Sequence, residues 1–413
     1  MNPVTDDDHN REIKKQWKLF KRNRKEELGL KHPFAHYRSL FPVLESKIHL
    51  ASCSQGAISK TVSESIEEYM NSLLSMGVNW NQAIKEVEKA KSSFAKLIGA
   101  APDEIAVFSS VSDIFSAIAS SLFFEKGKNI VVTTDMDFPT VGHVWLAQEK
   151  FGANVRFIPS QQGVIPLEYY ERYVTSDTLI TSISHIGYHN GFKQDIQAIA
   201  EIVHRKGSLL LVDAYQSAGQ VPIDVKKMDI DILAAGTRKY ILGIPGISFL
   251  YIKKELAEKW KPRITGWFGQ ENHSKFNVHQ FTLAAGARRF ETGTPSFISA
   301  YAAAAALRLL LDIGVENISS YLNPLAQFAL DYGQEKGLHV AGPLSADQRG
   351  AMTAFYVKNA EQIESILKER NIIVSARNDV IRIAPHFYNT QDEIRQVIDE
   401  LTTALIQTNG GNE

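Results

Sequence analysis

The sequence predicts an α/β fold in which a large domain with a mainly parallel central sheet is followed by a smaller α+β domain. Seven short apolar segments recur between about residues 105 and 252, and segments with helical patterning separate several of them. After Pro295 the pattern changes to a mixture of helices and strands at a different spacing. The chain has 413 residues, of which 44% are hydrophobic and 22% charged, so it can build two or more domains with cores of their own.

The apolar segments are mostly uniform rather than alternating, which is typical of strands buried on both faces of a parallel sheet. We expect these strands at 105–108, 129–134, 155–158, 179–184, 208–213, 231–236 and 247–252. We expect helices between some of them, at 112–122, 139–150 and 195–206. Repeated strand–helix–strand units of this kind predict an open sheet covered by helices.

Three parts of the chain can be distinguished. They are a charged N-terminal arm or helix at 1–47, a large domain at 48–296 and a small C-terminal domain at 297–413. The small domain is predicted to begin with an Ala-rich helix and to continue with strands near 351–357 and 380–384 and helices near 360–369 and 391–405. Segment 9–31 is rich in Lys and Arg, and a nucleic-acid-binding arm is one interpretation. An amphipathic helix that packs on the body or on a second subunit is favoured.

The composition excludes several classes of partner. The 45 basic and 46 acidic residues leave a formal charge of −1, which gives no reason to expect nucleic acid as a partner of the whole chain. The sequence has no run of 18 apolar residues, so we expect no membrane-spanning helix. The only cysteine is Cys53, so no intrachain disulfide can form and a reducing compartment fits. The 12 histidines show no zinc-ligand spacing. We therefore expect a cytoplasmic protein without a metal.

Two ionisable residues follow neighbouring strands within segment 209–251. Asp213 ends one strand, and Lys239 comes shortly after the next. In an open α/β sheet, ligand-binding groups gather at the carboxyl ends of the strands. Pyridoxal phosphate (PLP) needs such a pair, because a carboxylate keeps its pyridine nitrogen protonated while a lysine amine binds its aldehyde carbon and moves protons. Alone, Asp213 could cap a helix and Lys239 could lie on a surface loop. The two together favour a PLP site.

Seven separated segments resemble the class V aminotransferase superfamily, whose fold is PLP fold type I, over about residues 48–405. They are HLASCSQG (49–56), VFSSVSD (107–113), DFPT (137–140), HIGYHNG (185–191), DAYQ…TRKY (213–240), GWFGQ…RRFETGTP (266–295) and RIAPHFYNT (382–390). That superfamily includes cysteine desulfurases, kynureninase, isopenicillin N epimerase and several aminotransferases. The resemblance implies a large PLP-binding domain and a smaller α+β C-terminal domain.

The resemblance also implies a role for each matching residue. Lys239 is the Schiff-base lysine, and Asp213 pairs with the pyridine nitrogen. Arg382 clamps the carboxylate of a small-molecule amino-acid substrate. Thr294 reaches the phosphate of the neighbouring subunit, which implies a homodimer with shared active sites. The other implied cofactor contacts are Gln216 with the ring hydroxyl, Phe138 on the ring face, Tyr188 and Trp267 beside the cofactor, and Val111, Ser112 and Thr237 around the phosphate.

Several of these roles have structural alternatives. Phe138 could belong to the core, Ser112 could only cap a helix, and Arg382 could form a surface ion pair. Trp267 could line the substrate pocket instead of covering the phosphate. Cys53 lies on a predicted active-site turn, where a substrate contact is possible, but an inert small residue is the favoured interpretation.

The departures from individual subfamilies leave several activities open. Desulfurases need a nucleophilic cysteine late in the chain, and this chain has none after Cys53. DAYQ stands where kynureninase has Asp-Leu-Ala-His, and Arg238 is neither the His of desulfurases nor the Tyr of kynureninase. We expect an enzyme that acts at the α-carbon of an amino acid, by transamination or by C–S or C–C lyase chemistry. Epimerisation and a non-catalytic, PLP-fold binding or regulatory role are the alternatives.

Overall fold

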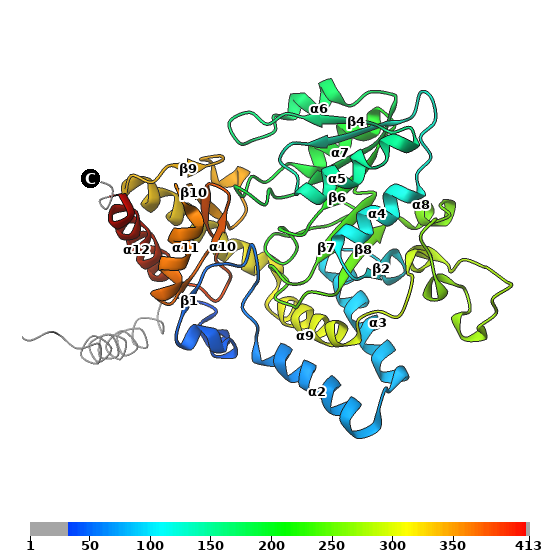
Figure 1. Ribbon diagram of the computed structural model, residues 1–413, viewed down its shortest axis with the longest axis horizontal. Helices are drawn as coiled ribbons and strands as arrows, with labels where there is room; N and C mark the ends of the chain where they lie inside the picture. The colour runs from blue at the N-terminus through cyan, green and yellow to red at the C-terminus, as the bar shows by residue number, and fades with distance from the viewer. Residues whose placement is uncertain (1–31, 410–413) are drawn as a thin grey trace, which may run out of the picture.

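The computed structural model describes residues 32–409, in which a seven-stranded sheet is flanked by helices and joined to a small antiparallel sheet (Figure 1). The charged segment 9–31 lies outside these residues. The large sheet has the order β2-β8-β7-β6-β5-β3-β4, and β8 alone runs antiparallel to its neighbours. Its strands are β2 (Ile105–Phe108), β3 (Ile130–Thr134), β4 (Asn154–Ile158), β5 (Thr178–Ser184), β6 (Leu209–Asp213), β7 (Ile232–Gly236) and β8 (Ser248–Ile252). The predicted mainly parallel sheet is confirmed, with every strand within one residue of its expected bounds.

The sheet is buried on both faces because successive residues of one strand belong to two different cores. In β6, Leu210 and Val212 belong to the main core, whereas Leu211 belongs to a second core. The main core lies on the face covered by α3 (Trp80–Leu97) and α7 (Ile196–Arg205). The second core lies on the face covered by α4 (Val111–Ser121) and α5 (Pro139–Leu146). Each fully buried aliphatic side chain contributes about 1.5–3 kcal/mol of transfer free energy, which favours uniformly apolar strands.

Helices α4, α5 and α7 are those predicted between the strands, with one correction. The expected helix at 139–150 ends at Leu146, and a separate 3-10 turn follows at Glu149–Phe151. That turn ends at Gly152, whose φ of 100° lies in the left-handed region that glycine adopts without strain. Five further helices were not predicted from the sequence: α2 (Lys60–Met76), α3, α6 (Leu167–Tyr173), α8 (Lys254–Lys259) and α10 (Val315–Glu335).

The C-terminal part contains the four-stranded antiparallel sheet β12-β13-β10-β9 and the helices that cover it. The predicted Ala-rich helix is α9, drawn in yellow in Figure 1, and it packs against α2 and α3. The elements are α9 (Phe297–Ile313), β9 (Val340–Ala341), β10 (Thr353–Tyr356), α11 (Ala360–Glu369), β11 (Ile372–Ile373), β12 (Ser375–Arg377), β13 (Val380–Ile383) and α12 (Gln391–Asn409). They confirm the expected helices and strands of this region. The domain boundaries at 47/48 and 296/297 stay predictions.

Strand β1 (Ile48–His49) pairs in parallel with β11, so the start of the predicted large domain is hydrogen-bonded to the C-terminal part.

Within residues 32–409 no single helix is long and apolar enough to cross a membrane. Helices α9 and α10 pass that test only as a pair, and they are bent by 78° at their junction.

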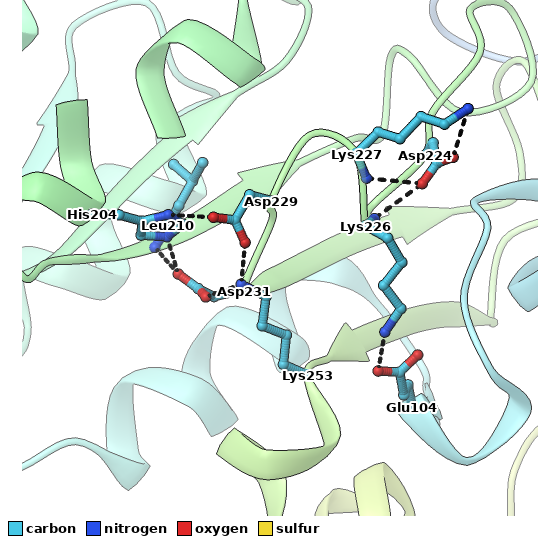
Figure 2. A network of polar contacts seen from close by, with 9 residues as sticks. All are labelled: Glu104, His204, Leu210, Asp224, Lys226, Lys227, Asp229, Asp231 and Lys253. Carbon is cyan, nitrogen blue, oxygen red and sulfur yellow. Dashed lines mark hydrogen bonds and ion pairs between the residues drawn. The ribbon is translucent and has the colours of Figure 1, made fainter. Parts of the chain in front are cut away.

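A network of charged side chains joins α7, β6, β7 and β8 at the edge of the sheet where β6 and β7 begin (Figure 2). His204 contacts two carboxylates, Asp229 at 2.9 Å through Nδ1 and Asp231 at 2.8 Å through Nε2. The Lys253 ammonium lies 2.6 Å from Asp229 and 2.7 Å from Asp231. The backbone N–H of Leu210 donates to Asp231 at 2.8 Å. Because both ring nitrogens of His204 face acceptors, the network favours the doubly protonated, charged ring.

We expect His204→Gln to lower the free energy of unfolding by about 1 kcal/mol near pH 5.5 and by clearly less near pH 9. The hydrogen bond with Asp231 raises the pKa of His204 above its ordinary value of 6.5, against an opposing effect of burial. A raised folded-state pKa stabilises the protein fully below 6.5, and this stabilisation is lost as the pH rises through the folded-state pKa. Urea unfolding at both pH values measures the difference. His339→Gln, at an exposed histidine, is the control, and a destabilisation that does not change with pH would contradict the expectation.

Candidate active site

A cavity of about 310 Å³ lies at the carboxyl ends of the parallel strands. The segments that follow β2, β3, β5, β6 and β7 all contribute to its wall, because parallel strands end at the same edge of a sheet. The hairpin β12–β13 contributes from the C-terminal part. The residues predicted for the site that line this cavity are Val111, Ser112, Phe138, Tyr188, Asp213, Gln216, Lys239 and Arg382.

Lys239 is buried, with 7% of its surface exposed, so the alternative of a surface-loop lysine is wrong. Its Nζ lies 4.2 Å from the ring centre of Tyr215 and 6.0 Å from that of Phe138. Within residues 32–409 this amine has no hydrogen-bond or ion-pair partner. Burial lowers the pKa of Lys239 to about 8, although the charge of Asp213 opposes the shift. An amine with this pKa is available in its neutral, nucleophilic form near neutral pH.

Asp213 faces the same cavity and is equally buried. Its Oδ1 accepts a hydrogen bond from the backbone N–H of Tyr215 at 2.8 Å. Burial raises the pKa of Asp213 to about 6, against the lowering effect of that hydrogen bond and of Lys239. In the described part of the chain no ion pair joins Asp213 to Lys239. Burying a carboxylate and an amine that do not contact each other lowers the free energy of unfolding, unless a polar group binds between them.

The first turn of α4 supplies the donors for an anion. Helix α4 has 11 residues, and Val111 and Ser112 at its start line the cavity. The alternative that Ser112 caps this helix is wrong, because Ser110 is the N-cap and accepts from the N–H of Asp113 at 3.1 Å. The Ser112 hydroxyl donates instead to Thr140 Oγ1 at 3.2 Å. Free amides, hydroxyls and the helix dipole together favour a phosphate at this end of the cavity.

Phe138 reaches the cavity because a buried aspartate holds the segment before it. Asp137 Oδ2 accepts from the Thr133 hydroxyl at 2.8 Å and from Thr134, through its backbone N–H at 2.9 Å and its hydroxyl at 3.0 Å. Its Oδ1 accepts from the backbone N–H of Ser184 at 2.6 Å and from the Ser184 hydroxyl. Phe138 is 41% exposed and meets Tyr188 edge-on at 5.1 Å between ring centres. The alternative of a core residue is therefore wrong.

Gln216 connects the cavity to the turn after β1. Its Nε2 donates to the carbonyl of Cys53 at 3.0 Å. The cysteine is almost fully buried, and it lines the cavity beside Gln216. The structure thus places Cys53 in the wall of the cavity, so the predicted position on an active-site turn is confirmed.

Arg382 is 1% exposed, so the alternative of a surface ion pair is wrong. Its Nη1 donates to the carbonyl of Tyr188 at 2.8 Å, and its Nη2 donates to Ser375 Oγ at 2.6 Å. Its Nε donates to the Ser375 carbonyl at 3.4 Å. A guanidinium carries five N–H groups, two of them on each Nη. One N–H on each Nη is therefore left for a carboxylate in the cavity.

Three predicted residues do not line the cavity. Thr237 is buried, and its hydroxyl donates to the carbonyl of Ile244 at 2.6 Å. Trp267 lies at the start of a 3-10 turn, with its ring centre 6.3 Å from Trp80 and 5.9 Å from Phe276. Thr294 is exposed in a neighbouring cavity. Their roles toward a cofactor stay predictions.

The cavity also includes residues that sequence reasoning did not assign to the site. Tyr215 and Arg238 both line it, and both stand inside the motifs that surround Asp213 and Lys239. Arg377 lines it from β12, a three-residue strand that the sequence analysis did not expect. No periodic pattern in the sequence indicated Arg377, because a three-residue strand is too short to show one.

Relatives of this chain are found by sequence over nearly its whole length. The family model of aminotransferase class-V matches residues 51–398. The uncharacterized aminotransferase YcbU of Bacillus subtilis (strain 168) is 51% identical over 377 residues, which cover 91% of this chain and all of that protein. A probable cysteine desulfurase of Pyrococcus abyssi is 26% identical over 396 residues and covers 89% of this chain and 97% of its own length.

Solved structures show the same fold. A cysteine desulfurase from Thermococcus onnurineus NA1 matches with a TM-score of 0.82 and 22% identity, over 92% of this chain and 99% of that one. The cystine C-S lyase C-DES matches with a TM-score of 0.80 and 21% identity, over 88% of this chain and 99% of that one. The family match, the 51% identical relative and the shared fold agree with one another. The chain belongs to the class V aminotransferase family.

Proposed function

We propose that this chain is a PLP-dependent enzyme that acts at the α-carbon of an amino acid, by transamination or by C–S or C–C lyase chemistry. One observation carries the proposal: a buried amine, Lys239, and a buried carboxylate, Asp213, face one cavity without an ion pair between them in the described structure. Membership of the class V family supports it independently.

The side chains of the cavity fit PLP at each end. Lys239 would hold its aldehyde carbon, and Asp213 would pair with its ring nitrogen. The start of α4 would hold its phosphate, and Phe138 would lie on its ring face. Gln216 would contact the ring hydroxyl. When bound, PLP supplies an electron sink for the α-carbon of the substrate.

The residues of this chain then position the substrate and move its proton. Arg382 binds the α-carboxylate through its two remaining Nη hydrogens, which fixes the orientation of the bonds at the α-carbon. Once the substrate's own amine occupies the aldehyde carbon in its place, the released Lys239 amine would accept the α-proton at Nζ. A pKa of about 8 allows that amine to accept and return a proton near neutral pH. Asp213 places a fixed negative charge at the end of the site opposite the phosphate.

A homodimer with shared active sites is part of the proposal. Thr294 is exposed in a cavity that shares Ser109 with the main cavity, so a second copy could reach the phosphate end from this side. Trp80 and Phe276 are exposed and flank Trp267. An exposed aromatic cluster of this kind is typical of a protein–protein interface.

We also propose a cytoplasmic location. Cys53 is the only cysteine of the chain, and it is a buried free thiol. A protein without disulfides fits a reducing compartment. Fractionation of the native host cell measures the location, and recovery of the protein outside the cytoplasm would contradict it.

A product screen tests the reaction. The purified protein with PLP is incubated with single amino acids, with and without an added keto acid, and the products are identified by mass spectrometry. Transamination predicts more than one equivalent of a new keto acid per active site only when the acceptor is present, whereas lyase chemistry predicts repeated loss of a side-chain substituent without it. The Lys239→Ala variant should lose the activity by several orders of magnitude. Products that differ from the substrate only in configuration would show an epimerase, and no product at all would support a non-catalytic role.

Mixing two inactive variants tests the shared sites. Lys239→Ala lacks the reactive amine, and Thr294→Asp places a negative charge where the partner's phosphate would lie. If each site takes Lys239 from one chain and Thr294 from the other, a mixed dimer has one intact site and one doubly defective site. Refolding an equal mixture should restore about a quarter of the wild-type sites. If Thr294 serves its own chain, the mixture regains no activity and the shared-site proposal fails. The proposal also fails if sedimentation shows a monomer that binds PLP tightly.

A further inference from the structure

The cavity has one more arginine than a phosphate and a single carboxylate occupy when each of them is paired with one arginine. Three guanidinium groups line it, those of Arg238, Arg377 and Arg382, whereas Asp213 is the only acidic residue among its described lining. Guanidinium groups stay charged at every physiological pH. A cavity with such a lining attracts anionic groups, and each arginine can be matched to a different part of a bound molecule.

Arg238 belongs to the phosphate end. Its charge lowers the pKa of Tyr215, against the larger raising effect of burial, so it lies near that hydroxyl. The Tyr215 ring packs on the second core, which is the core on the α4 face of the sheet. Because Arg238 lines the cavity beside Tyr215, we assign it to the end where the first turn of α4 would hold the phosphate.

Arg377 and Arg382 lie together on one face of the hairpin β12–β13. Arg382 stands opposite Ser375 in the register of the two strands, and the two side chains are hydrogen-bonded. Arg377 is two residues beyond Ser375 on the same strand, and alternate residues of a strand share a face. Both arginines line the cavity, Arg382 at a buried position and Arg377 at an exposed one.

Arg377 has no hydrogen-bond or ion-pair partner among residues 32–409. The acidic residue of its own hairpin, Asp379, pairs instead with His189, with 3.1 Å between Oδ1 and Nε2. An arginine at the mouth of a cavity, beside the arginine that would bind the α-carboxylate, is placed to bind a second anionic group of the same substrate.

We propose that the substrate is an amino acid with an anionic side chain, of the dicarboxylic class. Arg382 binds its α-carboxylate, and Arg377 binds the carboxylate of its side chain. The inference rests on the proposed function, because it assigns Arg382 and Lys239 their roles there. It adds Arg377 as the residue that determines side-chain specificity.

Matched substrates test this inference on the PLP-loaded enzyme. Aspartate is compared with asparagine, and glutamate with glutamine, because each pair differs in charge and hardly in size. Binding is followed by the change in visible absorbance of the bound cofactor, and turnover by product formation. The wild-type protein should bind the acid at least about 10-fold more tightly than the amide, as expected for a charge-assisted, bidentate contact.

Two variants of Arg377 and one control isolate its contribution. Arg377→Gln should remove the preference by weakening binding of the acids while leaving the amides unchanged, and Arg377→Glu should weaken the acids further. Arg308→Gln is the matched control, because Arg308 lies on α9 with 83% of its side chain exposed and does not line the cavity. Both sites are exposed, so each variant should fold, and circular dichroism checks this.

Two results overturn the inference. One is a wild-type protein that binds amides as tightly as acids. The other is an Arg377→Gln variant that loses acids and amides by the same factor, since Arg377 would then only support the hairpin. If no amino acid of any charge changes the absorbance of the bound cofactor, the proposed function itself fails, and this outcome is distinct from the loss of acid preference.

Discussion

The structure depends on keeping two opposite charges buried but apart. Removing an ion from water costs several kcal/mol in a folded protein, and a direct Asp213–Lys239 contact would recover much of that cost. In the described structure Asp213 and Lys239 form no ion pair. The pKa of the Lys239 amine is lowered to about 8, and the pKa of the Asp213 carboxyl is raised to about 6. Both shifts have burial as their largest cause. A cationic ring nitrogen beside Asp213 and a covalent bond to the Lys239 amine would offset this cost, so cofactor binding would stabilise the fold.

The surrounding structure fixes where each group of the cavity points. The parallel strands bring the cavity segments to one edge, and Asp137 ties the ends of β3 and β5 together through buried hydrogen bonds. Gln216 holds the turn that contains Cys53. Arg382 joins the small sheet to the carbonyl of Tyr188 in the large domain. A movement of the hairpin β12–β13 would therefore shift Arg377 and Arg382 relative to Lys239 and Asp213 in the same cavity.

The sequence predicted the structure best where a pattern of residues has a single physical explanation. Uniformly apolar strands need two covered faces, so the sheet was predictable to within one residue, and Asp213 and Lys239 followed from their place at strand ends. It was less informative for α2, of which only Val62 is buried, and for α3, whose buried face includes the charged residues Glu86 and Lys91. The end of α5 was also missed, because Gly152 follows only after a separate 3-10 turn. Arg377 was not predictable, because a three-residue strand has no periodic pattern and only the hairpin register turns its side chain toward the cavity.

We propose that one amine of this chain, that of Lys239, holds the cofactor, and this assignment has a direct chemical test. Borohydride reduction of the purified protein, followed by proteolysis and mass spectrometry, locates the lysine that carries it. We expect a phosphopyridoxyl group on the peptide that contains Lys239, in near-stoichiometric amount, and none on the same peptide of a Lys239→Arg protein. A phosphopyridoxyl group on a different lysine, or a purified protein that takes up no PLP when the cofactor is supplied, would contradict it.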